Sequence, residues 1–163
     1  MSNVYVSTYG CAFNQADSES MAQLLVNAGH RIVEREEDAE VKIINSCTVK
    51  NKTDLKFRKE LRATSLPTVV AGCIPQAQKN RADIQDYVTI GPNTLHNVVD
   101  AVEDALAGRV VHYYAENNNA QDDRISIGGV NNNPIEIVPI NKGCLSKCSY
   151  CETKFARGDL VSF

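Results

Sequence analysis

Apolar strand patterns alternate with helical patterns over the first 108 residues, and this alternation restricts the fold more than any other feature of the sequence. Helical spacing of apolar residues occurs at 17–28, at 53–64, and from a cap at Asn93 or Thr94 to Leu106, where Gly108 ends the pattern. Strands that alternate with helices are typical of βαβ units. We therefore predict an α/β fold, with an open, mostly parallel sheet flanked by helices. The expected strands are at 3–8, 41–45, 68–71 and 87–90.

The alternation ends near Gly108, which divides the chain into three parts. We expect an α/β domain at 1–109 and a linker or hairpin at 110–133, where residues 110–114 can add a strand and 117–133 contain six Asn. The apolar segment at 135–140 (IEIVPI) then predicts a new strand, which begins a third part at 134–163.

Composition and charge exclude a membrane protein and a strongly basic nucleic-acid binder. No segment approaches the roughly 20 apolar residues of a membrane helix, and residues 1–10 lack the pattern of a secretion signal. We therefore expect a cytoplasmic protein. Net charge is −3, but residues 50–62 hold six basic and two acidic side chains. This basic run is either a solvated helix face or a contact for an RNA backbone.

Three of the six cysteines, Cys11, Cys47 and Cys73, each follow one of the first three expected strands. In a reducing compartment, grouped cysteines more often bind metal or act in catalysis than form disulfides. Loops after the carboxyl ends of parallel strands meet at one edge of the sheet, where ligands bind. A shared ligand is therefore our preferred interpretation; the alternative is three small buried apolar side chains.

The other three cysteines lie in residues 144–151 (CLSKCSYC), with C-x3-C-x2-C spacing. Thiolates are the usual ligands of iron–sulfur clusters, and three of them leave one iron of a 4Fe-4S cluster open. That iron can chelate S-adenosylmethionine, and the reduced cluster can cleave it to a 5′-deoxyadenosyl radical. Tyr150 is either an aromatic that packs near the bound adenine or an ordinary loop residue.

A structural zinc site is the alternative for the second cysteine set. Zinc normally takes four protein ligands, and the sequence supplies only three cysteines locally, so His112 would have to join them. His30 and His96 lie near expected helix ends and are better read as cap or surface residues. Zinc leaves Cys11, Cys47 and Cys73 unexplained, whereas an electron-transfer iron–sulfur protein without radical chemistry remains a further alternative.

Four segments contain the six cysteines, and a fifth lies at 91–95. In the same order, these five segments resemble successive segments of the radical-SAM methylthiotransferase family. The resemblance covers essentially the whole chain. The phrases CTVKN and TKFARG are closest to the archaeal and eukaryotic branch, which acts on N6-threonylcarbamoyladenosine in tRNA. The segments are TYGCAFNQADS at 8–18, NSCTVKN at 45–51, AGCIPQ at 71–76, GPNTL at 91–95 and NKGCLSKCSYCETKFARGD at 141–159.

The resemblance implies two 4Fe-4S clusters and a particular reaction. Cys11, Cys47 and Cys73 match the ligands of the auxiliary cluster, which is tied to the inserted sulfur. The second set, Cys144, Cys148 and Cys151, matches the ligands of the radical-SAM cluster.

The implied reaction uses two S-adenosylmethionine molecules, one to methylate sulfur and one to generate the radical, and attaches methylthio at C2 of the adenine. The implied partners are tRNA and an electron-donor protein; a sister branch modifies a ribosomal-protein side chain instead. We assign Tyr150 to cofactor binding and no residue to catalysis.

The same resemblance implies that the radical-SAM part is incomplete. Its partial barrel consists of βα units of about 30 residues each, and the sequence at 134–163 supplies only the first strand and the cluster loop. We therefore expect a truncated chain that is inactive alone. An unpaired apolar strand at 135–140 would also favour self-association.

Overall fold

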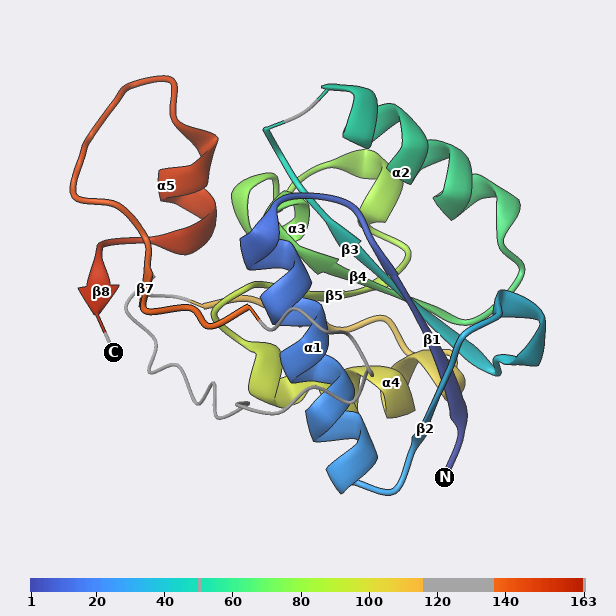
Figure 1. Ribbon diagram of the computed structural model, residues 1–163. Coiled ribbons are helices and arrows are strands. Elements are labelled where there is room, and N and C mark those ends of the chain that lie inside the picture. The colour runs from blue at the N-terminus through green and yellow to red at the C-terminus, as the bar shows by residue number, and fades with distance from the viewer. Residues whose placement is uncertain (50, 116–136, 163) are drawn as a thin grey trace.

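The computed structural model describes residues 1–49, 51–115 and 137–162 (Figure 1). Its centre is a six-stranded parallel sheet with the strand order β2-β1-β3-β4-β5-β6. The predicted α/β class with a parallel sheet is therefore confirmed. The strands are β1 Asn3–Thr8, β2 Arg31–Val33, β3 Val41–Ser46, β4 Thr68–Gly72, β5 Val88–Ile90 and β6 His112–Tyr113.

Helices cover both faces of the sheet. The helices α1 (Ala12–Asn27) and α4 (Val98–Leu106) lie on one face, and α2 (Asn51–Ala63) and α3 (Cys73–Ala77) on the other (Figure 1). Short 3-10 turns occupy Glu36–Asp38, Ala82–Ile84 and Leu95–Asn97. The result is a three-layer arrangement in which the sheet is the middle layer.

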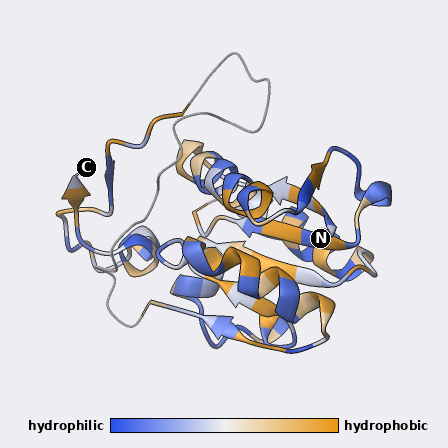
Figure 2. Cartoon of the chain, turned by 90° about the horizontal axis from the view of Figure 1, so that it is seen from below, coloured by the Kyte–Doolittle hydropathy of each residue, from blue (hydrophilic) through white to orange (hydrophobic). Residues whose placement is uncertain are grey.

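The central strands are apolar on both sides because both of their faces are buried. In β3, Val41 and Ile43 face the core under α1 and α4, whereas Ile44 packs with Phe57 of α2. A strand covered on both faces reads as a continuous apolar run instead of an alternating one. Figure 2 shows these apolar strands between helices whose outer faces are hydrophilic.

The sequence predicted most of the long elements but missed two short ones. Strand β1 has the predicted bounds, whereas α1 begins at Ala12, five residues before the predicted start at residue 17. The edge strand β2 and the helix α3 were not predicted, because three and five residues are too few to show a period. Strand β6 lies beyond residue 109 and extends the sheet.

The C-terminal segment contains β7 (Asn141–Lys142), α5 (Glu152–Arg157) and β8 (Val161–Ser162), and β7 pairs antiparallel with β8. The strand predicted at 135–140 is wrong for residues 137–140, which have no strand neighbour within the described part of the chain; 135 and 136 lie outside it. Helix α5 packs against α3 (Figure 1). The last described segment is therefore docked on the sheet domain through a helix.

Within the described residues, no helix has the length and apolar character that crossing a membrane requires. The longest, α1, has 16 residues and carries several buried polar side chains.

Candidate functional site

Three neighbouring strands of the sheet carry the first cysteine set at their carboxyl ends. Cys11 lies between β1 and α1, Cys47 directly follows β3, and Cys73 is the first residue of α3, directly after β4. Strands β1, β3 and β4 are adjacent in the sheet. The fold therefore brings these cysteines to one edge, although 36 and 26 residues separate them in the sequence.

The strand register places Cys47 and Cys73 side by side. Ser46 pairs with Gly72 as the last pair of the parallel ladder, and each of these two residues is followed directly by a cysteine. Neighbouring strands lie about 4.8 Å apart. Both cysteines are 4% exposed, whereas Cys11 is exposed. Two of the three thiols are thus held together under the surface.

Gly72 makes this close approach between β3 and β4 possible. Its φ of +98° is one that residues with a side chain rarely adopt, and a Cβ there would stand 2.4 Å from the Ser46 carbonyl oxygen. The turn from β4 into α3, which presents Cys73, therefore requires glycine.

A buried network of amides and hydroxyls joins the loops that hold the first set. The Asn14 side chain donates to Asn45 Oδ1 and to the Ser46 carbonyl, both at 3.1 Å. Asn45 Nδ2 donates to the Asn14 carbonyl and to Ser18 Oγ, both at 2.8 Å. Because Asn14 and Asn45 are 0% exposed, each broken bond would leave a buried polar atom unpaired. The network therefore fixes the start of α1 against the end of β3.

The Cys73 thiol is held in its neutral form. Burial raises the pKa of Cys73 to about 11, and the nearby Asp17 and Cys47 act in the same direction. The Arg157 guanidinium acts in the opposite direction. A metal would therefore have to displace a proton that burial holds on this sulfur.

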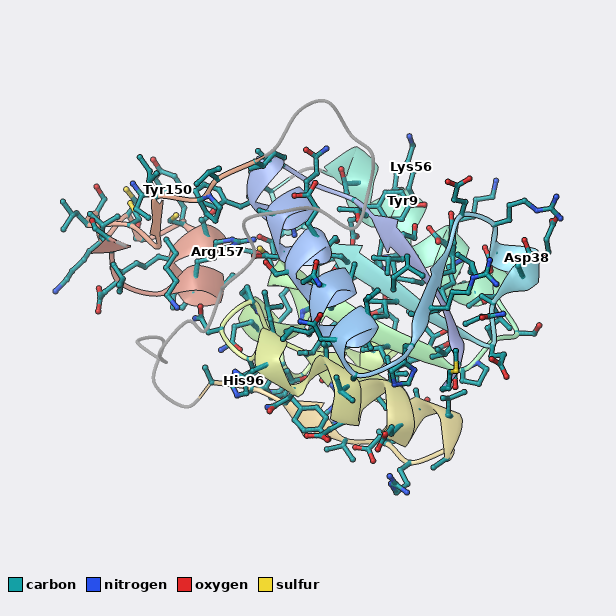
Figure 3. The ribbon with its side chains drawn as sticks, turned by 60° about the horizontal axis from the view of Figure 1, so that its bottom comes forward. Tyr9, Asp38, Lys56, His96, Tyr150 and Arg157 are labelled. Atoms are coloured by element: carbon teal, nitrogen blue, oxygen red, sulfur yellow. The ribbon has the colours of Figure 1, made fainter. Side chains whose placement is uncertain are left out.

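Arg157 of α5 reaches across to the sheet domain and is buried there. Its Nη2 donates to Asp17 Oδ2 at 2.6 Å, and the two side chains are 4% and 0% exposed. The guanidinium carbon lies 5.2 Å from the centre of the Phe13 ring. Burial disfavours the charged form of Arg157, yet Asp17 and Cys73 raise its pKa above its usual value. Figure 3 shows Arg157 between α5 and α1.

The second cysteine set lies on a short loop around the start of α5. Cys151 immediately precedes α5 and its amide donates to the Cys148 carbonyl at 3.2 Å, while the Cys144 amide donates to the Gly158 carbonyl at 3.2 Å. Cys148 is exposed and the other two are half-buried. Tyr150 is 86% exposed and lies on the outer side of this segment (Figure 3). Its ring is free to contact a ligand from solvent.

The donor chemistry of both sets suits iron–sulfur clusters, because each offers three thiols. In the described part of the chain, no group of three or more His, Cys, Asp or Glu side chains is already gathered around one metal position. Cys11 Sγ instead donates to Asn14 Oδ1 at 3.4 Å. A metal shared by the first set would bind the Cys11 thiolate, which has no proton to donate, so this hydrogen bond to Asn14 would be lost. Both cluster assignments stay predictions.

The three histidines have other surroundings. His112 Nδ1 lies 2.9 Å from Thr89 Oγ1, and its ring stacks on Tyr114 at 5.7 Å. His30 is buried and His96 is exposed. Within the described ranges none of them belongs to a group that could hold a metal.

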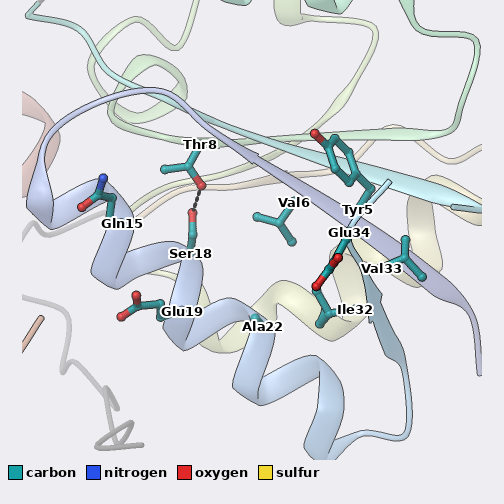
Figure 4. A pocket seen from close by; sticks show the side chains of 10 residues that line it. All are labelled: Tyr5, Val6, Thr8, Gln15, Ser18, Glu19, Ala22, Ile32, Val33 and Glu34. Atoms are coloured by element: carbon teal, nitrogen blue, oxygen red, sulfur yellow. Dashed lines mark hydrogen bonds between the residues drawn. The ribbon is translucent and has the colours of Figure 1, made fainter. Parts of the chain in front are cut away.

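A groove of about 560 Å³ lies between α1, β1 and β2 (Figure 4). Its lining includes Tyr5, Ile32 and Glu34, and Thr8 Oγ1 lies 2.8 Å from Ser18 Oγ at one end. Among the described residues that line it there is no cysteine. The groove is therefore separate from the sheet edge that carries the first set.

Sequence reasoning missed the polar residues that support the cysteines, above all Asn14, Asp17 and Arg157. A signal was present in α1, because Asn14 and Ser18 continue the helical stripe of the core residues Met21 and Leu25. Polar residues in phase with a buried stripe indicate a buried network. For Arg157 the sequence contained no comparable signal.

Comparison with known proteins identifies the family to which the chain belongs. Residues 3–90 match the family model described as "Uncharacterized protein family UPF0004". The chain belongs to this family. The match spans strands β1 to β5, and with them the whole first cysteine set.

Several curated relatives match over nearly the whole chain, which confirms the resemblance found in the sequence. The chain is 39% identical over 171 residues to a Danio rerio protein named "Threonylcarbamoyladenosine tRNA methylthiotransferase", with 100% of the chain and 31% of that protein covered. It is 40% identical over 169 residues to a Drosophila melanogaster protein of the same name, with 98% and 30% covered.

A Pyrococcus horikoshii protein, named "Probable threonylcarbamoyladenosine tRNA methylthiotransferase", is 35% identical over 167 residues, with 100% and 39% covered. The chain thus spans about a third of the length of these relatives.

Proposed function

We propose that this chain is part of a tRNA methylthiotransferase that adds a methylthio group to C2 of N6-threonylcarbamoyladenosine beside the anticodon. The printed names of relatives that are 35–40% identical over the chain support this reaction and tRNA as substrate. They favour it over the sister reaction on a ribosomal-protein side chain.

The observation that carries the proposal is the convergence of Cys11, Cys47 and Cys73 at the carboxyl ends of three adjacent strands. Open parallel sheets bind their ligands at this edge. Isolated buried cysteines would have no reason to occupy equivalent positions on three neighbours. These residues would hold an auxiliary 4Fe-4S cluster, and Cys144, Cys148 and Cys151 a second one.

When bound, the clusters supply an electron that cleaves S-adenosylmethionine, and the sulfur for transfer. The chain's own residues prepare the two places. The sheet edge shields Cys47 and Cys73 from water, and the Asn14–Asn45 network fixes the loops around them. The exposed ring of Tyr150 would pack on the adenine of S-adenosylmethionine. A cytoplasmic location and an electron-donor protein stay predictions.

The test is the iron, sulfide and zinc content after anaerobic reconstitution. It compares the unaltered chain with two matched triple variants, in which either Cys11, Cys47 and Cys73 or Cys144, Cys148 and Cys151 are changed to Ala. We expect each variant to lose about four irons, the content of one 4Fe-4S cluster. Zinc near one equivalent without iron would instead favour a zinc-stabilised binding module. Iron unaffected by the first variant would remove these cysteines from the mechanism.

A further inference from the structure

The ion pair between Arg157 and Asp17 joins segments that lie 140 residues apart in the sequence. Both side chains are removed from water, at 4% and 0% exposure. Burying two charges is costly, so a buried pair is weak support for stability alone. Its position offers another role, because Arg157 belongs to α5, which packs against α3, and Cys73 is the first residue of α3. The guanidinium is near enough to that thiol to oppose the rise in its pKa.

The Arg157 guanidinium has a hydrogen-bond donor that is not used beside Asp17. Its Nη1 is buried and has no hydrogen-bond partner among the described residues. A guanidinium carries five donors in a rigid, planar fork, and a buried donor without a partner is costly. Asp17 and the Phe13 ring, 5.2 Å from the guanidinium carbon, hold the fork in place. An acceptor such as a sulfur bound next to Cys73 would satisfy the free donor.

We propose that Arg157 is a positioning residue with two linked tasks: it docks the segment of the second cysteine set on Asp17, and it donates to the sulfur atoms of a cluster held by Cys11, Cys47 and Cys73. The docking task stands on the contacts above. The second task rests on the proposed function, since it requires the auxiliary cluster.

The two tasks have separate physical consequences. Without Asp17 as its anchor, α5 loses its buried ion pair with the sheet domain and keeps only its packing against α3. A fixed cation that donates to cluster sulfur favours the reduced form, which carries one more negative charge, so its removal lowers the reduction potential. A residue that only maintained the fold would change neither the cluster's potential nor its spectrum once the cluster was loaded.

Docking is tested on the metal-free chain by amide hydrogen exchange of α5. Arg157→Met removes the charge, Arg157→Lys keeps the charge without the fork, and Arg109→Met is the matched control. Arg109 also pairs with an aspartate, Asp104, but is 60% exposed. We expect exchange in α5 to rise on the order of 100-fold in Arg157→Met, and not in the control. Unchanged exchange in Arg157→Met would overturn the docking task.

The second task is tested in a background where Cys144, Cys148 and Cys151 are Ala, so that only the auxiliary cluster can form. One-electron redox titration with dithionite and electron paramagnetic resonance then compare Arg157 with the same variants. We expect a lower potential in Arg157→Met, an intermediate one in Arg157→Lys and no change in Arg109→Met. An unchanged potential and spectrum in either loaded Arg157 variant would overturn this task.

The background protein separates the inference from the proposed function. If it binds no iron while Arg157 is intact, the auxiliary cluster itself is wrong, and the second task falls with it. The hydrogen-exchange result still decides the docking task.

Discussion

The two cysteine sets are held in opposite ways. The first set lies on strands of six, six and five residues in a parallel sheet that is covered on both faces. The second lies on the loop between β7, a strand of two residues, and α5, a helix of six. Cys47 and Cys73 are buried, whereas Cys148 is exposed.

The difference shows that local spacing and structural support are independent. The second set has its three cysteines within eight residues, so it needs little scaffold to bring three thiols together. The cysteines of the first set come near one another only in the folded domain, because the sheet brings them to one edge. We therefore expect damage to the sheet to affect the first set through the whole domain, and damage to the loop to stay local.

The largest expected effect comes from Gly72→Ala. The new Cβ would meet Asn45 Oδ1 at 2.3 Å and the Ser46 carbonyl at 2.4 Å, in a left-handed backbone conformation. Strain and overpacking together should lower the free energy of unfolding by about 2–5 kcal/mol, measured by urea denaturation. The control is Gly108→Ala, which has φ +67° but no atom within 4 Å of the new Cβ; it should cost about 1 kcal/mol. Equal losses would mean that the sheet edge is not tightly constrained.

The next largest effect is a difference between Cys73 and Cys148 in their rates of alkylation by iodoacetamide, measured on the metal-free, reduced chain. Burial raises the pKa of Cys73 from 9.0 to about 11, and this alone lowers its thiolate fraction at neutral pH about 100-fold. We expect Cys73 to react at least that much more slowly in the native protein than in urea, and the exposed Cys148 to react at similar rates in both. Peptide mass spectrometry gives both rates. Fast native alkylation of Cys73 would remove the contrast between the sets.

Gly143→Ala should disturb only the second set. A Cβ at Gly143 would stand 2.0 Å from the Asp159 carbonyl oxygen, so the contact between β7 and the end of α5 must open. The free energy of global unfolding should change by less than about 1 kcal/mol, because few core residues depend on this loop. Amide exchange at 141–162 should rise while that of β3 and β4 stays unchanged. A global loss as large as that of Gly72→Ala would show that the two regions unfold as one unit.

The smallest expected effect is a pH dependence of the local stability of residues 152–162, next to the second cysteine set. Lys154 contacts Asp159 and lowers the pKa of its carboxyl below the ordinary 3.8. Because the folded pKa is the lower one, the contact stabilises the loop fully above the ordinary value of 3.8, and this stabilisation is lost as the pH falls through the folded pKa. Amide chemical shifts of 152–162, followed from about pH 6 to pH 2, should change in the unaltered chain. In Asp159→Asn this change should disappear; if it persists, another group controls the loop.

The long elements of the fold followed from the sequence because each shows its period over enough residues. Strands β1, β3 and β4 were recognisable from apolar runs, and α4 from its stripe and the stop at Gly108. The start of α1 was missed because its first turns bury Asn14 and Asp17 in place of apolar side chains. The strand predicted at 135–140 failed for 137–140 because an apolar run forms a strand only beside a partner strand.

The candidate site was predictable as a set of cysteines but not as a geometry. Strand order made the convergence of Cys11, Cys47 and Cys73 an expectation. That Cys11 donates to Asn14, and that Arg157 reaches Asp17, depends on side-chain packing, in the second case between segments 140 residues apart. No local pattern encodes such contacts.

The separation between Asp17 and Arg157 also has a consequence for the order of events during synthesis. Strands β1, β3 and β4 are complete by Gly72, whereas the ribosome adds Arg157 85 residues later. Closing a long loop costs entropy, so the contact between α5 and the sheet domain forms last. A nascent chain can therefore present Cys11, Cys47 and Cys73 on a finished sheet edge before the guanidinium covers it. In the function proposed above, this interval is when the first set would be most accessible to a protein that delivers its cluster.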